Sequence, residues 1–397
     1  MTGLLNLAVI AVLAAGTPIV AWSVLKGLAP GIVVELVVGL VVGPHGLGWI
    51  SLTGPVDTLA QLGLAFLFFL AGLDIDLSAL RGELLLRSLS SYAAGFVVAL
   101  GCTCLLRALG LVSAPVLLAV ALSATGLGLV VPLLREAALL TTPLGHVVAA
   151  AGSVAEFSAV VFLALGFSSA HSPLLKITLL GVLVALTLAV TLAARRLGAR
   201  AVVTSLIDRL SNGTAQLRVR LSVTLIVGFA ALAQALGLEL VLGAFFAGGI
   251  LNVLDRGMRN RDFRSQLDGI GFGLLIPIFF IVSGAKLDLS SLSWWPDSLV
   301  VPLLVAALLA ARGLPTFLLQ LDSKQEILGV GLLCATSLPF IVTATQVGLQ
   351  QGRLDLATAA AVTSAGLIGV CLFPTLGIRA LRTGGASSAE AGPHPPT

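Results

Sequence analysis

The sequence predicts an all-α polytopic membrane protein with about thirteen transmembrane helices, arranged as inverted six-helix repeats with two crossed discontinuous helices. Three observations lead to this prediction. Hydrophobic residues make up 58% of the 397 positions and charged residues only 10%, which lies outside the range of soluble domains. Apolar runs of about twenty residues, long enough to cross ~30 Å of hydrocarbon, recur along the whole chain. Short motifs of the first half return in the second half at a nearly constant offset.

The apolar runs do not alternate as the strands of a membrane barrel would, so we expect helices. The first run has no basic residue before it and no clear cleavage site, which favours a retained helix over a signal peptide. In chain order the expected spans are roughly 4–24, 30–50, 57–75, 84–107, 114–134, 144–167, 173–194, 219–236, 238–254, 267–286, 298–320, 326–349 and 356–380.

Basic residues are distributed unevenly between the loops. If the N-terminus is outside, nearly all Lys and Arg residues fall in inside loops, and the exceptions are Arg107, Lys176 and Arg353. Because loops rich in Lys and Arg remain in the cytoplasm, this bias predicts an outside N-terminus in the plasma membrane. The odd number of spans then places the C-terminus in the cytoplasm.

The chain divides into two halves at its longest polar segment. We expect a first repeat plus linker helix at 1–194, with core helices at 114–167, and a cytoplasmic loop at 195–220. A second, inverted repeat follows at 221–382, with core helices at 326–380. Residues 383–397 are mainly Gly, Ala, Ser and Pro, which predicts a disordered cytoplasmic tail and no cytosolic regulatory domain.

Four motifs recur in order between the halves. Gly72, Asp76, Ser78 and Leu80 at the end of the third span match Gly284, Asp288, Ser290 and Leu292 at the end of the tenth. Gly39 in the second span corresponds to Gly248 in the ninth, Ala124-Thr125 to Ala335-Thr336, and 149–151 to 359–361. Corresponding helices are seven spans apart, an odd number, so the two repeats have opposite orientations in the membrane.

Two corresponding spans contain helix-breaking or polar residues at their middle. The fifth contains Ser123, Thr125 and Gly126, followed by Pro132; the twelfth contains Thr336, Ser337 and Pro339. Unwound backbone at that depth is tolerated where it is buried in protein or lines a cavity. We expect the two breaks to cross and to present carbonyls, hydroxyls and helix ends to an ion. Small-residue helix packing is the alternative explanation for each break alone.

Ionisable residues inside the membrane are candidates for function because their burial is costly. Glu156 lies midway along the sixth span, with Ser153 one turn before it, and is the best candidate to bind a proton or a cation. The alternative is a structural carboxylate that bonds to a neighbouring helix. Lys286 is expected either to balance the charge of Glu156 or to extend to the outer surface.

Two further charges are secondary candidates. Arg312 lies deep in the eleventh span, where it could bind carbonyls or helix ends as a structural strut. Glu35 lies five residues into its helix and is either a second buried carboxylate or a hydrated one near the cytoplasmic surface. Asp74 and Asp76 are expected at the cytoplasmic mouth, where they would concentrate cations.

Other chemistries find little support in the sequence. The four cysteines lie in apolar runs without disulfide or zinc spacing, and the four histidines are scattered. A phosphate-binding loop and an enzymatic constellation are both missing from the sequence, so we expect neither an ATP-driven pump nor an enzyme, and no cofactor. The net charge of +4 follows from the arginine-rich loops, so nucleic acid is not an expected partner.

Several segments together resemble a known family. These are Glu35-Leu-Val-Val-Gly39, Phe66 to Asp76, Leu242 to Gly248 and Pro277 to Gly284, with Ser123-Ala-Thr125 before the acidic helix. In order and over most of the chain they resemble the second monovalent cation:proton antiporter family, the Kef-like and NapA-like exchangers. The resemblance implies a homodimer formed through a scaffold domain and a mobile core domain that carries the ion by an elevator-like movement. It also implies an acid or amide followed by an acid on the sixth helix, where this chain has Ala155-Glu156, and a lysine on the tenth that matches Lys286.

The resemblance and the single membrane acid together suggest electroneutral exchange of Na⁺ or K⁺ for protons, in the service of pH homeostasis. Two other functions are consistent with the sequence. A sodium-coupled organic-anion symporter would have a related fold but more than one cation site, and a non-transporting membrane sensor would be consistent with the apolar Ala155.

Overall fold

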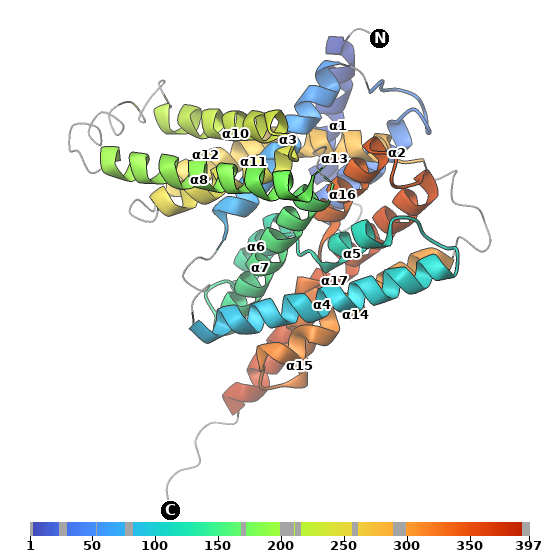
Figure 1. Ribbon diagram of the computed structural model, residues 1–397. Helices are drawn as coiled ribbons and strands as arrows, with labels where there is room; N and C mark the ends of the chain where they lie inside the picture. Colours follow the sequence, from blue (N-terminus) through green and yellow to red (C-terminus); the bar gives the residue numbers. More distant parts are fainter. Residues whose placement is uncertain are drawn as a thin grey trace, which may run out of the picture. The chain divides into compact units, whose positions relative to one another are not determined.

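The computed structural model describes residues 3–23, 30–52, 54–75, 82–167, 172–198, 210, 216–255, 261–288 and 299–390. Over these ranges every regular element is helical, which confirms the predicted fold class (Figure 1). The elements are α1 (Gly3–Ser23), α2 (Gly31–Val42), α3 (Pro55–Leu73), α4 (Gly82–Ala108), α5 (Pro115–Ser123), α6 (Leu127–Glu136), α7 (Pro143–Gly166), α8 (Pro173–Gly198), α10 (Leu217–Ala235), α11 (Leu240–Asp255), α12 (Arg261–Ile270), the π-helix η1 (Gly271–Leu275), α13 (Ile276–Ala285), α14 (Val300–Gly313), the 3₁₀ helix η4 (Leu314–Leu319), α15 (Lys324–Cys334), α16 (Leu338–Gln350) and α17 (Leu356–Glu390).

The number of membrane spans agrees with the prediction of about thirteen. In the described part of the chain, eleven helical segments are long and apolar enough to cross a membrane, and two shorter apolar helices lie at Gly31–Val42 and Leu240–Leu254. The segment Pro115–Glu136 comprises α5 and α6, and Lys324–Gln350 comprises α15 and α16. The fifth and twelfth expected spans are therefore broken helices.

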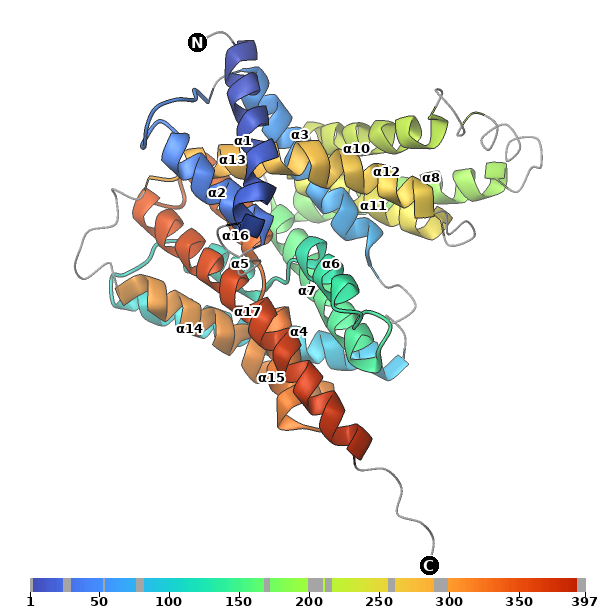
Figure 2. The same ribbon diagram turned by 180° about the vertical axis from the view of Figure 1, so that it is seen from behind.

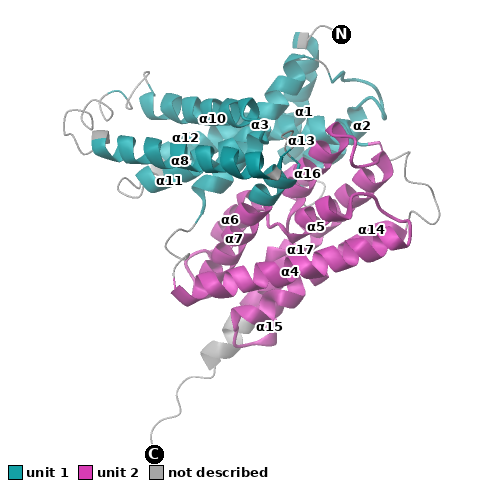
Figure 3. Ribbon diagram, in the orientation of Figure 1, with its two compact units in different colours: residues 1–22, 34–75, 160–287 teal, residues 23–33, 76–159, 288–397 magenta. Residues whose placement is uncertain are grey.

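The chain forms two compact units, and neither unit coincides with a half of the sequence (Figure 3). Unit 1 comprises residues 1–22, 34–75 and 160–287, and unit 2 comprises residues 23–33, 76–159 and 288–397. Each unit therefore combines helices from both halves. The reason lies in the helix pairing, because α3 packs on α11 and α13, and α4 packs on α14, across the two halves.

In unit 1, glycines from both repeats allow close helix crossings, and Figures 1 and 2 show the helices concerned side by side. A Cβ on Gly39 of α2 would lie 2.0 Å from the Ile281 carbonyl oxygen of α13, and one on Gly284 of α13 would meet Leu36 at the same distance. The equivalent crossing joins α3 and α11 through Gly72 and Gly248, whose Cβ atoms would meet backbone oxygens at 2.2 and 2.0 Å. The repeated glycines thus have one structural role, used twice.

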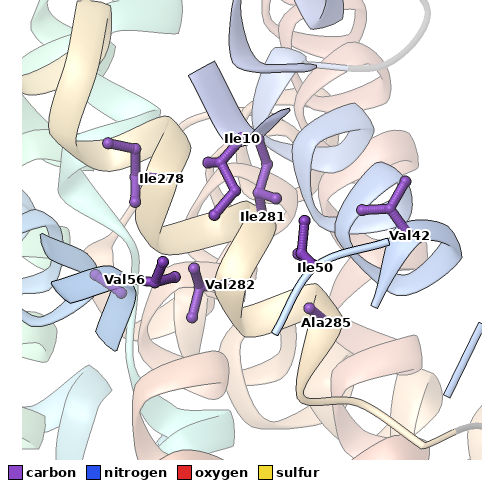
Figure 4. Close-up of a cluster of buried hydrophobic side chains, with 9 residues drawn as sticks. Ile10, Val42, Ile50, Val56, Ile278, Ile281, Val282 and Ala285 are labelled. Atoms are coloured by element: carbon purple, nitrogen blue, oxygen red, sulfur yellow. The ribbon is translucent and has the colours of Figure 1, made fainter. Parts of the chain in front are cut away.

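An apolar cluster fills the space beside the α2–α13 crossing (Figure 4). Its members are contributed by α1, by α2 and the segment that follows it, by α3 and by α13. They are Ile10, Val42, Ile50, Val56, Ala60, Ile278, Ile281, Val282 and Ala285, all less than 9% exposed. Because lipid tails are as apolar as these side chains, the cluster stabilises the crossing through close van der Waals packing.

The C-terminal end of α3 is closed by polar contacts. Asn252 of α11 donates to the carbonyl oxygens of Leu73 and Ile75, which satisfies acceptors left open at a helix end. Arg264 of α12 forms ion pairs with Asp74 at 2.8 Å and with Asp268 at 3.1 Å. Asp74 therefore has a structural partner, which argues against the expected role in concentrating cations; Asp76 lies outside the described residues.

Unit 2 contains the two broken helices, with α4, α14 and α17 packed against them. The starts of α15, α16 and α17 have features typical of helix starts. Ser323 and Glu326 form a capping box at the start of α15, and Pro339 occupies the first turn of α16. At the start of α17, Asp355 accepts hydrogen bonds from the backbone N–H and the hydroxyl of Thr358, both at 2.8 Å.

Two expected segments can be compared with the structure only in part. The expected loop at 195–220 overlaps the end of α8 and the start of α10, and its residues 199–209 and 211–215 lie outside the described part. The last helix, α17, extends to Glu390, whereas the sequence predicts a disordered tail from residue 383. Residues 383–390 thus continue the helix although they include two glycines, and 391–397 lie outside the described residues.

Candidate functional site

The two breaks are short non-helical linkers between half-helices of unit 2. Helix α5 ends at Ser123 and α6 begins at Leu127, while α15 ends at Cys334 and α16 begins at Leu338. The sequence predicts the breaks from Gly126 and Pro339, and both residues border the linkers. Pro132, by contrast, lies inside α6 rather than at the break.

The linkers contact each other directly. The Gly126 N–H donates to the Thr336 carbonyl oxygen at 2.8 Å, and the Thr125 hydroxyl donates to the Cys334 carbonyl oxygen at 2.7 Å. A Cβ on Gly126 would lie 3.1 Å from Cδ of Pro339, tighter than most real contacts. Gly126 is therefore needed for the close approach, and the predicted crossing of the two breaks is observed within unit 2.

Glu156 of α7 reaches the start of α6. Its Oε2 accepts a hydrogen bond from the Leu127 N–H at 2.6 Å, and the residue is only 3% exposed. Gly152, one turn earlier, allows this approach, because a Cβ there would lie 2.7 Å from Leu127 Cδ2. The carboxylate thus lies at the first residue of a half-helix, where free amide hydrogens and the helix dipole favour negative charge.

Arg312 of α14 reaches the same crossing from another helix and is 3% exposed. Its Nη2 donates to the Thr125 hydroxyl at 3.0 Å, and its Nε points to the Cys334 carbonyl oxygen at 3.4 Å. Cys334 is the last residue of α15, and the C-terminal end of a helix favours positive charge. The structure therefore supports the expectation that Arg312 binds hydroxyls and helix ends.

The two charges occupy complementary positions. Glu156 contacts the N-terminal end of α6 and Arg312 the C-terminal end of α15, and only Gly126 separates Thr125 from Leu127 in the chain. The short stretch from Thr125 to Leu127 thus contacts both a buried acid and a buried base. A change in the charge of Glu156 would act directly on the start of α6.

Buried hydroxyls surround the breaks. Ser153 and Ser337 are each 1% exposed, and their Oγ atoms have no hydrogen-bond partner among the residues described. Ser123 donates to the Val120 carbonyl and Thr336 to the Leu332 carbonyl. Buried polar groups normally have partners, so the Ser153 and Ser337 oxygens are available as ligands for a cation or water. Oxygen ligands of this kind suit hard cations.

Two sequence-predicted residues have other surroundings. Lys286 lies in unit 1, where its Nζ is 2.6 Å from Oδ1 of Asp57 at the start of α3, so the structure gives it a partner other than the expected Glu156. Asp57 in turn accepts a hydrogen bond from Gln61. Glu35 is 6% exposed with its Oε2 buried and unbonded within the described residues, which contradicts the hydrated alternative.

Three participants were not predicted from the sequence. Asp57 resembles an ordinary acidic residue in the first turn of a helix, and the backbone groups of Leu127 and Cys334 have no signature in the sequence. The breaks themselves were the one available signal, since they expose backbone groups to side chains from other helices.

Comparison with known proteins places the chain in a family. The profile described as "Sodium/hydrogen exchanger, transmembrane" matches residues 9–381. The chain belongs to the sodium/hydrogen exchanger family. This is a family of multi-pass membrane transporters and not of enzymes, and the resemblance to cation:proton antiporters is confirmed.

Several relatives show how far the similarity to this family extends. The Na⁺/H⁺ antiporter of Enterococcus hirae is 25% identical, over 82% of this chain and 85% of its own. The Bacillus subtilis protein YjbQ, whose name proposes Na⁺/H⁺ antiport, is 30% identical over 88% of this chain but only 58% of its own. The chain thus spans little more than half the length of YjbQ, and 35% of cation/H⁺ antiporter 19 of Arabidopsis thaliana.

A solved structure has the same fold. The sodium proton antiporter MjNhaP1 of Methanocaldococcus jannaschii, determined at pH 8, matches with a TM-score of 0.67 and 18% identity. The match covers 99% of this chain and 100% of the other. At that identity it supports the fold of the exchanger family in this chain and leaves the site to be argued from the chain's own residues.

Proposed function

We propose that this chain is a secondary transporter that exchanges a monovalent cation, Na⁺ or K⁺, for protons across the plasma membrane. The observation that carries the proposal is the buried Glu156 carboxylate, held at the start of α6 where the two broken helices cross. A carboxylate in this position can bind either a proton or a cation but not both at once, and this competition couples the two fluxes. The names of the E. hirae and B. subtilis relatives support Na⁺ as the first cation to test.

The surrounding residues have distinct roles in this mechanism. Glu156 binds the proton or the cation, and the Ser153 hydroxyl and oxygens of the linkers at Ser123, Thr125, Thr336 and Ser337 complete the ligand shell of the cation. Gly126 and Pro339 keep the linkers unwound and in contact. Arg312, rather than Lys286, is the counter-charge of the site, since it contacts Thr125, two residues before the Leu127 N–H that Glu156 binds.

Alternating access follows the division of the chain. Unit 2 contains the broken helices and the proposed ligands, which supports an elevator-type movement in which unit 2 carries the ion while unit 1 acts as a scaffold in a homodimer. We place the N-terminus outside and the C-terminus in the cytoplasm, as the distribution of basic residues indicates.

Exchange is tested in proteoliposomes with a pH-sensitive dye inside. Sequential addition of Na⁺, K⁺ and Li⁺ to the wild type is expected to change the internal pH, and Glu156→Gln is expected to reduce the response to that of empty liposomes. The matched control is Glu326→Gln, which replaces another buried carboxylate of unit 2 in a capping box that also accepts Gln, and it is expected to retain exchange. Unchanged exchange in Glu156→Gln would refute the site assignment.

A further inference from the structure

Glu35 is a buried carboxyl group that the proposed exchange cycle does not use. It lies on α2 in unit 1, is 6% exposed, and its Oε2 has no hydrogen-bond partner within the described part of the chain. The repeat that relates Gly39 to Gly248 also relates Glu35, four residues earlier, to a residue of α11. That residue is Ala244, which is 0% exposed. One half of the chain thus has a carboxyl group at an interior position where the other half has a methyl group.

The neighbouring helices of unit 1 offer this carboxyl group no cation. The helices that share an apolar cluster with α2 are α1, α3 and α13. Helices α1 and α13 contain no ionisable side chain, and α3 contains only Asp57, in its first turn. The charges at the helix ends are already paired: Nζ of Lys286, which follows α13, lies 2.6 Å from Oδ1 of Asp57, and Asp74, which follows α3, pairs with Arg264.

The buried hydroxyls of α1 and α13 are also in use, since each donates within its own helix. Thr17 donates to the Ala14 carbonyl oxygen at 2.9 Å, and Ser283 donates to the Phe279 carbonyl oxygen at 2.6 Å. An ionised Glu35 would therefore receive neither a cation nor a hydroxyl hydrogen from these helices. Burying an unpaired charge costs far more free energy than burying a neutral polar group, so the neutral acid is the stable form of Glu35 here.

We propose that Glu35 is a second proton-binding site of this chain, in unit 1, which keeps its proton as a neutral carboxylic acid at neutral pH and binds no cation. The surroundings of Glu156 differ in the feature that decides its charge. Glu156 accepts the Leu127 N–H at the start of α6, where the helix dipole favours a carboxylate. The proposal does not depend on exchange, but it leaves one carboxyl group, rather than two, to alternate between a proton and a cation.

Infrared spectroscopy of the purified full chain in lipid tests the protonation state of Glu35. At pH 7, the difference spectrum between the wild type and Glu35→Gln is expected to contain the C=O stretching band of a protonated acid and no carboxylate bands, with or without Na⁺. The matched control is Glu326→Gln. Glu326 accepts backbone N–H bonds from Asp322 and Ser323, so its difference spectrum should contain carboxylate bands. Carboxylate bands from Glu35, or an acid band that Na⁺ removes, would overturn the proposal.

A chemical reaction gives a second readout. Dicyclohexylcarbodiimide is an apolar reagent for protonated carboxyl groups: the carboxyl oxygen bonds to its central carbon, the proton moves to a nitrogen, and the acyl group then shifts to nitrogen, so that no group leaves. Mass spectrometry is expected to find this adduct on the peptide that contains Glu35, in equal yield with and without Na⁺, and not on the peptide that contains Glu326. A yield at Glu35 that Na⁺ lowers would show competition with the cation and contradict the proposal.

Transport separates this inference from the proposed function. Glu35→Gln keeps the shape of the neutral acid, so it is expected to exchange Na⁺ for protons with the KM of the wild type. A tenfold rise of KM for Na⁺ in this variant would show that Glu35 takes part in cation binding and would refute its assignment as a proton site alone. If the wild type shows no exchange with any cation while the infrared band of Glu35 is present, the proposed function fails and the proton site stands.

Discussion

Arg312 is the residue whose role changes most between sequence and structure. It is buried and bonded to a hydroxyl and a carbonyl of the two breaks. Removing the guanidinium takes a buried donor from the Thr125 oxygen and leaves the Cys334 carbonyl only its bond from the Thr125 hydroxyl. The loss of a buried donor costs more than the bond itself contributes.

We expect Arg312→Gln to lower the free energy of unfolding by about 1.5–3 kcal/mol, the range for hydrogen bonds to charged groups. Arg312→Lys keeps the charge but not the planar fork, so an intermediate loss is expected. Thermal unfolding in lipid-supplemented detergent measures both. Arg135→Gln, an exposed arginine at the end of α6, is the control and should differ little from the wild type; equal melting of all four proteins would contradict the role of Arg312.

At the scale of residues, the sequence identifies the right charges but not their partners. Glu156, Lys286, Arg312 and Glu35 are all identifiable as costly charges in apolar spans. Their pairing depends on which compact unit each helix joins, and a linear order of spans does not contain that information. Lys286 therefore looks like a partner for Glu156 from the sequence, whereas it pairs with Asp57 in unit 1.

At the scale of elements, the glycine crossings determine how closely helices of unit 1 pack. We expect Gly39→Ala to lower the free energy of unfolding by about 1–3 kcal/mol, because the added methyl group would overlap the Ile281 carbonyl oxygen. Gly181→Ala on α8 is the matched control, since nothing lies within 4 Å of its added Cβ. There the better helix propensity of Ala should leave stability equal or raise it by up to ~1 kcal/mol. Equal melting temperatures of the two variants would argue against the crossing.

The start of α17 makes a prediction about pH. Burial raises the pKa of Asp355, but hydrogen bonds from Ser113 and from the N–H and hydroxyl of Thr358 outweigh this and hold the pKa below its ordinary value of 3.8. A depressed pKa in the folded state means that the carboxylate stabilises the fold at pH values above 3.8, and that this contribution is lost as pH falls through the lower, folded value.

We therefore expect Asp355→Asn to melt at a lower temperature than the wild type at pH 7, since Asn keeps the cap but not the charge. The difference should be a few tenths of a kcal/mol because the residue is exposed, and it should shrink as the pH is lowered below 4. Melting curves at pH 7, 5 and 3.5 measure it. A difference that grows on acidification would contradict the sign of the shift.

The broken helices were predictable as elements because their causes are local. Gly126 and Pro339 mark the two linkers, and the repeat places them at equivalent positions. The contact of Leu127 with Glu156 was not predictable, because a backbone N–H carries no sequence signal and becomes available only when the helix is broken there.

At the scale of the whole molecule, the number of carboxylates at the site decides whether one transport cycle moves net charge across the membrane. With Glu156 as the one proposed carboxylate, we expect one proton to be exchanged for one monovalent cation, so that no net charge crosses the membrane. An imposed potential of 100 mV would supply about 2.3 kcal/mol per net charge moved, so a charge-moving cycle would be strongly driven by it. We expect the rate of exchange in proteoliposomes to change less than about twofold over that range. A transport current that flows under an imposed voltage, with equal ion concentrations on both sides, would contradict this expectation.

At this scale the sequence predicts the membrane class, the approximate number of spans and the inverted repeat, because hydropathy and motif spacing depend on composition and order alone. The division into two compact units could not be predicted from the sequence. In unit 1, α2 pairs with α13 and α3 with α11, and in unit 2, α4 packs on α14; each pair joins opposite halves of the chain.

The paired glycines also constrain how such a chain could have originated. Gly39 of the first half needs the helix that contains Gly284 of the second, and Gly248 needs the one that contains Gly72. An ancestor of half the length, with one copy of each glycine, could form these crossings only by associating with a second copy inserted in the opposite orientation. Gene fusion would then have joined two subunits that already depended on each other, and after fusion a glycine lost in one half could not be replaced by its counterpart in the other.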